Sequence, residues 1–190
     1  MTTVTTEGAE VTHSGEDPAA RSRLDQERAD IIETLRAHRN FLRHTVAGLS
    51  DEQAAQRTTV SELCLGGLIK HVSQVEENWI RFILEGPSAM PAAFEETAMA
   101  AYGEGFRMLG GETVAGLLAE YDRVAARTDQ LVASLESLDA TQPLPEAPWF
   151  PPGARRSARR VFMHIVAETA QHAGHADIIR ESLDGQKTMG

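Results

Sequence analysis

Four long segments of the chain share one pattern, in which apolar residues recur at three- and four-residue steps with polar residues between them. This spacing places the apolar side chains on one face of an α-helix, because a helix turns once in about 3.6 residues. We therefore expect helices over about residues 24–49, 62–84, 113–138 and 157–183. No segment shows a convincing strand pattern. The sequence predicts an all-α protein, a four-helix bundle around one core.

Residues that begin and end helices support these limits. Ser50, with Gln53 three residues later, matches a capping box that opens a short extra turn. Thr113 is a suitable cap for the third helix, and Gly185 follows the fourth.

The helices are joined by two long connections. Residues 86–111 have no sustained periodicity. Five of the eight prolines fall within residues 143–152, so we expect no regular structure there. Connections of this length favour crossovers between the helices over simple up-and-down winding.

Composition indicates one folded domain. A chain of 190 residues with 42% hydrophobic content can bury a sizeable core. Residues 1–20 are polar and acidic, and we expect them to form a disordered tail. The bundle is expected over residues 21–185, and residues 186–190 are expected to form a C-terminal tail.

Charge and cysteine content exclude several classes of function. With 18 basic and 28 acidic residues, the net charge of −10 opposes binding to nucleic acid or anionic membranes. No apolar run approaches the roughly 20 residues that cross a bilayer, and no signal peptide is apparent, which predicts a cytoplasmic protein. Cys64 is the single cysteine, so an internal disulfide and a thiolate cluster are excluded.

The fourth helical segment carries four ionisable residues in one row. They are His164, Glu168, His172 and His175. Their spacing of 4, 4 and 3 residues confines them to an arc of roughly 80° on a helix. Val161 and Ile179 lie within the same arc, so the row is expected to face inward. A metal ion would offset the cost of burying these groups.

Glu168 and His172 have the i, i+4 spacing at which two helical side chains can converge on one ion. A third ligand must then come from a facing helix, and His71 is the best candidate because its own helix face is apolar. The residues within about 40° of it are Cys64, Val75 and Phe82. Two imidazoles and a carboxylate with an open position are typical of catalytic zinc, although iron, nickel or manganese also fits.

Each of these histidines also has an interpretation without a metal. A histidine on an apolar face is commonly a hydrogen-bonded core residue, and the row on the fourth helix could be a polar network or an exposed stripe. His164 and His175 could orient a metal ligand or replace one. Cys64 lies about 10 Å from His71 along the helix, too far to share an ion, and is expected in the core. His38 and His44 lie among arginines of the first helix, which predicts a solvated face.

Arginines gather where the fourth helix begins. Arg155, Arg156, Arg159 and Arg160 lie where a helix dipole disfavours positive charge. They could bind an acidic group, form a solubilising patch, or pair with the acidic residues of segment 85–112. Trp149 and Phe150 could form a rim over a cleft or pack against the end of the bundle.

Two stretches of the chain carry a family resemblance: residues 61–79, SELCLGGLIKHVSQVEENW, and residues 164–181, HIVAETAQHAGHADIIRE. They resemble the DinB/YfiT-like superfamily, and most of all its actinobacterial branch of mycothiol S-transferases. Together with the order of the helices, the resemblance covers about residues 24–185. Its most specific parts are the GLIKH element that ends at His71 and the GHAD run that begins at Gly174.

The resemblance implies a four-helix bundle in which one histidine of the second helix and two residues of the fourth hold a metal. The matching positions are His71, Glu168 and His172. Many superfamily members have histidine at the position of Glu168, and the set here resembles that of the mycothiol-dependent maleylpyruvate isomerase. That isomerase has a further C-terminal domain that this chain lacks, so its substrate is not carried over.

The implied function is a metal-dependent S-transferase that uses mycothiol as its thiol and a small electrophile as its second substrate. Two alternatives belong to other classes. One is a metal-binding stress or sensor bundle without turnover, and the other is a hydrolase in which a metal-bound water attacks the substrate. The sequence leaves the electrophile, the native metal and the oligomeric state open, a homodimer included.

Overall fold

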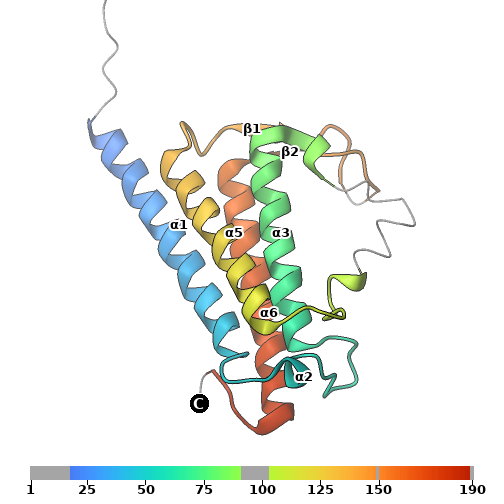
Figure 1. The fold of residues 1–190 in the computed structure, drawn as a ribbon. Coiled ribbons are helices and arrows are strands. Elements are labelled where there is room, and N and C mark those ends of the chain that lie inside the picture. Colours follow the sequence, from blue (N-terminus) through green and yellow to red (C-terminus); the bar gives the residue numbers. More distant parts are fainter. Residues whose placement is uncertain (1–17, 91–102, 149, 189–190) are drawn as a thin grey trace, which may run out of the picture.

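The computed structural model describes residues 18–90, 103–148 and 150–188, and it confirms the predicted all-α bundle (Figure 1). The four long helices are α1 (Pro18–His44), α3 (Leu65–Glu85), α5 (Val114–Ser134) and α6 (Ala158–Asp184). The shorter elements are α2 (Asp51–Ala54), the 3-10 turn η1 (Gly86–Ala89), and the strands β1 (Thr141–Pro143) and β2 (Arg155–Ser157). Within these residues no helix is both long and apolar enough to span a bilayer.

The long helices are arranged so that each packs against two others. α1 packs against α5 and α6, and α3 packs against the same two helices. α3 and α5 run in one direction, and α1 and α6 run in the opposite direction (Figure 1). The connection from α3 to α5 must therefore return along the length of the bundle, as predicted for a crossover. The second long connection is not a crossover, because it joins α5 to α6 at one end of the bundle (Figure 1).

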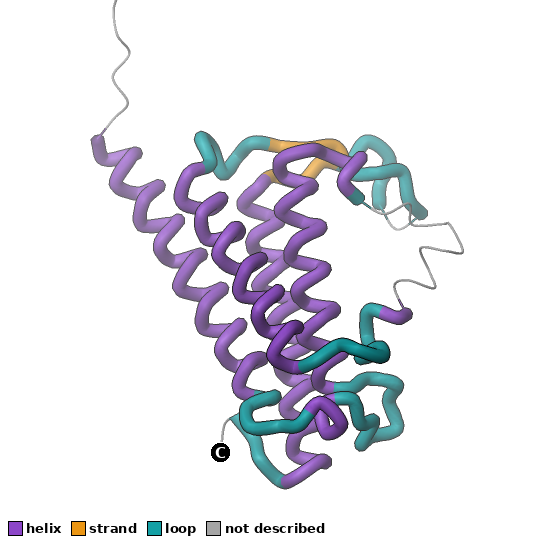
Figure 2. Tube along the Cα trace, viewed as in Figure 1, coloured by secondary structure: helices purple, strands orange, loops and turns teal. Residues whose placement is uncertain are grey.

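A two-stranded sheet closes one end of the bundle, and α2 lies at the other end (Figure 2). β1 and β2 pair antiparallel, with Thr141 opposite Ser157 and Pro143 opposite Arg155. The sequence showed no convincing strand pattern, so these two strands are a correction. The expected lack of regular structure in residues 143–152 holds for the described residues except Pro143, which ends β1. Strands of three residues are too short to show an alternating pattern, and proline is tolerated at the end of an edge strand.

The helix ends agree with the predicted caps. Ser50 and Gln53 form the capping box, and Thr113 accepts a hydrogen bond from the Gly116 amide. Gly185 ends α6 with a φ of 80°, a left-handed conformation that suits glycine. α1 nevertheless begins at Pro18 and ends at His44, five to six residues before the predicted limits, and α5 ends four residues early at Ser134.

The two expected tails are covered only in part. Residues 1–17 and 189–190 lie outside the described residues. At the C-terminal end the chain turns back onto α6, where Arg180 donates to Gln186 and the amide of Thr188 donates to Asp177.

The bundle core contains a buried ion pair that the sequence did not predict. Arg39, which was expected on a solvated face of α1, is 1% exposed and donates to both carboxylate oxygens of Glu76, which is fully buried. Arg39 also donates to Asp129 of α5 at 2.8 Å. This pair joins α1 to α3 between the two apolar parts of the core, so the expectation of a solvated face was wrong for Arg39.

Candidate metal centre

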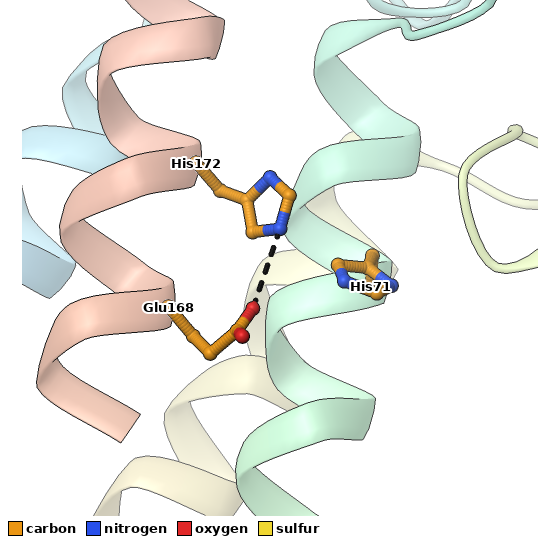
Figure 3. Close-up of side chains that lie close together, drawn as sticks. All are labelled: His71, Glu168 and His172. Atoms are coloured by element: carbon orange, nitrogen blue, oxygen red, sulfur yellow. Dashed lines mark ion pairs between the residues drawn. The ribbon is translucent and has the colours of Figure 1, made fainter. Parts of the chain in front are cut away.

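The three residues predicted as ligands lie together between α3 and α6 (Figure 3). His71 projects from α3, and Glu168 and His172 project from neighbouring turns of α6. Each side chain offers one nitrogen or oxygen atom, and these three atoms lie within 4.8 Å of one another. Zinc to nitrogen or oxygen bonds are about 2.0–2.2 Å long, so two ligand atoms on one ion lie at most about 4.4 Å apart. Binding of a common ion would therefore draw these side chains slightly closer together.

The antiparallel contact of α3 with α6 determines which residues meet. The rings of His71 and His172 are 4.8 Å apart, and two turns further along both helices the rings of Trp79 and His164 are 4.9 Å apart. Trp79 is eight residues from His71 on α3, and His164 is eight residues from His172 on α6. Both pairs therefore lie along the line of contact between the two helices, which we call the seam. The seam therefore presents polar groups along its length, with His71 and His172 at one end.

Burial sets the protonation of His71. His71 is 3% exposed, and its pKa is lowered from 6.5 to about 4, mainly by burial. The neighbouring His172 lowers this pKa further, and Glu168 raises it by a smaller amount. The contact with His172, at 3.5 Å, lowers the pKa of Glu168. At neutral pH the centre thus offers an unprotonated imidazole and an ionised carboxylate, which are the forms that bind a divalent cation.

In the metal-free protein we expect the free energy of unfolding to fall as the pH drops below 6.5. Between pH 6.5 and about 4 the unfolded chain binds a proton at His71 while the folded protein does not, so acid favours unfolding. The full effect is reached below about pH 4 and is on the order of 3 kcal/mol. Urea unfolding across this range measures it, and His71→Asn should lack this component. Identical pH profiles for the two proteins would contradict the expectation.

His164 and His175 contact the predicted ligands without joining the converging group. His175 Nδ1 lies 3.4 Å from His172 Nδ1, whereas the other ring nitrogen of His172, Nε2, faces Glu168. His164 Nε2 lies 3.7 Å from Glu168 Oε1. This placement suits a role in orienting His172 and Glu168, the first of the two roles that the sequence left open.

Phe106, which was not predicted from the sequence, forms one wall of the centre. Its ring stacks on His71 with the centroids 3.9 Å apart. A Cβ atom at Gly67 would overlap the Phe106 carbonyl, so this segment of the crossover can approach α3 only because residue 67 is glycine. The pair Gly66–Gly67 inside a predicted helix was the available signal, since glycine is unfavourable there.

Gly67→Ala is expected to push Phe106 away from His71 and to lower the free energy of unfolding by about 1–3 kcal/mol, despite the better helix propensity of alanine. Gly174→Ala is the matched control, because a Cβ atom at residue 174 would meet nothing within 4 Å, and it should stabilise the protein by up to about 1 kcal/mol. Urea unfolding and the aromatic NMR shifts of His71 measure the two effects. Equal stabilisation by both variants would contradict the close approach.

The remaining predicted residues have separate places. Cys64 is 2% exposed at the start of α3, in the core as expected. Trp149 lies outside the described residues. Among the arginines, Arg159 pairs with Glu27 and Asp139, and Arg155 donates to Thr141.

Pairing of the arginines with segment 85–112 is not seen among the described residues. Glu85 pairs with Arg81 and Glu112 pairs with Lys70. Glu95 and Glu96 lie outside the described residues.

Arg156 lies between two aromatic rings, those of Trp79 and Phe150.

The fold and the site define a class: an α-helical bundle whose two facing helices carry a His-Glu-His cluster that could hold a metal ion. The model of the Mycothiol-S-transferase family matches residues 30–185, and the chain belongs to this family. The family resemblance inferred from the two sequence stretches is thereby confirmed. A search of curated proteins found no match.

Proposed function

We infer that this protein is a metal-dependent transferase that joins mycothiol to a small electrophile. The observation that carries the proposal is the convergence of His71, Glu168 and His172 within 4.8 Å. Family membership supports mycothiol as the thiol, because the family is named for transfer of this compound.

The donor set fits a divalent cation. His71 and His172 would supply nitrogen and Glu168 would supply oxygen, a combination for which zinc is the first candidate. A divalent cation held there would favour the thiolate form of a bound thiol at neutral pH. The side chain of Glu168 is 28% exposed, against 11% for His172, so the centre is open to solvent on the Glu168 side.

The chain itself would orient the reactants and exclude water. Phe106 covers one face of His71 and keeps that side of the centre dry. Cys64 is buried and does not serve as the nucleophile, which in this proposal is the sulfur of the incoming thiol. In the proposed reaction this sulfur attacks the electrophilic carbon, a C–S bond forms, the leaving group departs with its bonding electrons, and the thiol proton passes to solvent.

Elemental analysis of the purified protein, followed by a thiol-consumption assay with mycothiol and a model electrophile, tests the proposal. We expect about one divalent ion per chain and consumption of thiol that stops when a chelator removes the metal. Bound metal without consumption across many electrophiles would favour a non-catalytic metal-binding bundle. Turnover without thiol would favour a hydrolase. A protein that purifies without metal and cannot be loaded would contradict the proposal.

A further inference from the structure

Arg156 occupies an unusual position at the end of the seam between α3 and α6. Its guanidinium carbon lies 4.8 Å from the centre of the Trp79 ring and 5.3 Å from the centre of the Phe150 ring. Its Nη1 atom is buried and has no hydrogen-bond partner among the described residues. A buried guanidinium nitrogen without an acceptor is costly, so an acceptor from outside the chain would be bound favourably.

The charge near Arg156 is not balanced by the described part of the chain. Burial and the neighbouring Arg160 lower the pKa of Arg156, which places a second positive charge close to the first. None of the ion pairs among the described residues involves either arginine, although Arg159 has two carboxylate partners. Carboxylates are plentiful in a chain with net charge −10, so two neighbouring arginines without a carboxylate partner among the described residues indicate a site for an external anion.

A chain of side-chain contacts connects this site to the candidate metal centre. Arg160, His164, Glu168 and His172 follow one another at four-residue intervals on α6. The ring of Trp79 stacks against the guanidinium of Arg156 and also contacts the ring of His164. The Cα atoms of Arg160 and Glu168 are about 12 Å apart along the helix axis, and the long side chain of Arg160 can reach across part of this distance.

An aromatic ring and a proline-rich loop lie beside Arg156. Phe150, which stacks on Arg156, also lines a cavity of about 500 Å³ inside the loop of residues 144–153. Prolines form much of the remaining lining, and Glu146 is its acidic residue. Such surroundings suit a ligand with an apolar or aromatic body and one anionic group.

We propose that Arg156, assisted by Arg160, binds the carboxylate of the electrophilic substrate, so that the protein selects electrophiles that carry a carboxylate. The planar guanidinium can give two parallel hydrogen bonds to a carboxylate, which a neutral amide cannot match in strength. The substrate role of the ligand rests on the proposed function, whereas the binding of the carboxylate does not.

Calorimetric titration of the full chain with benzoate and with benzamide tests the binding. We expect benzoate to bind at least about tenfold more tightly than benzamide. Arg156→Met should remove this preference and leave benzamide binding unchanged. Arg155→Gln removes one charge from the same strand at an exposed residue and should leave the preference intact. Equal binding of both probes by the wild type, or an unchanged preference in Arg156→Met, would overturn the proposal.

Turnover of 4-chloro-3-nitrobenzoate and of its amide tests the role in catalysis. The ratio of their kcat/KM values should favour the carboxylate by about tenfold in the wild type and approach unity in Arg156→Met. If neither compound consumes thiol, the role of Arg156 in turnover is rejected for these electrophiles, the assay across many electrophiles decides the proposed function, and the calorimetric result decides whether Arg156 binds a carboxylate. If Arg156→Met does not fold, Arg156→Lys serves in its place, because it keeps the charge but loses the paired hydrogen bonds and should show a reduced preference.

Discussion

Replacing His172 by alanine is expected to remove most of the metal from the purified protein, with a loss of at least about 100-fold in affinity. His172 belongs to the converging group and contacts Glu168, so its loss removes a nitrogen donor and the neighbour that positions the carboxylate. The helices should stay folded, because alanine has a higher helix propensity than histidine. Elemental analysis and far-UV circular dichroism measure the two effects.

His44→Ala is the control for this variant, because His44 is an exposed histidine at the end of α1. It should leave the metal content unchanged, and thiol consumption should follow the metal in both variants. Full metal occupancy in His172→Ala would contradict the assignment of the three ligands. Loss of metal together with loss of helical signal would require the same measurement on Glu168→Gln, which keeps the shape of the side chain.

Glu76→Leu is expected to lower the free energy of unfolding by about 3–5 kcal/mol. The substitution leaves the guanidinium of Arg39, 1% exposed, without its main acceptor. Asp129, at 2.8 Å, still accepts one hydrogen bond and compensates only in part. Urea unfolding monitored by circular dichroism measures the loss.

The double variant Arg39→Met with Glu76→Leu should recover much of this stability, since two apolar side chains of similar size then replace the pair. Glu85→Gln is the surface control. Its partner Arg81 is also exposed, so the loss should be much smaller than that of Glu76→Leu. A loss in Glu76→Leu no greater than that of Glu85→Gln would show that the buried pair contributes little to stability.

The helices were predictable because their signals are local. The three- and four-residue spacing of apolar residues located α3 and α6, and caps such as Thr113 and Gly185 marked where helices begin and end. The polar stretch of α1 before Leu24 continues the helix without an apolar face, so periodicity could not detect it. The β1–β2 pair depends on a contact between residues about 12 to 16 positions apart and leaves no pattern within either strand.

The candidate site was predictable to the extent that one helix carries most of it. The i, i+4 spacing of Glu168 and His172 is a local feature, and the apolar face around His71 indicated which helix would complete the group. Phe106 could not be foreseen in the same way, because it reaches His71 through a connection without periodicity. The sequence around Arg39 does not distinguish it from an exposed arginine. Only the packing of the helices shows that it is buried.

The proposed donors come from α3 and α6, which are separated along the chain by residues 86–157. Neither helix alone offers all three, so an ion could be retained only after the two helices have docked. Loading the protein with zinc should therefore raise its melting temperature in proportion to the logarithm of free metal concentration. By the same linkage, heating would release the ion as the bundle opens, and an isolated α6 peptide would bind it only weakly.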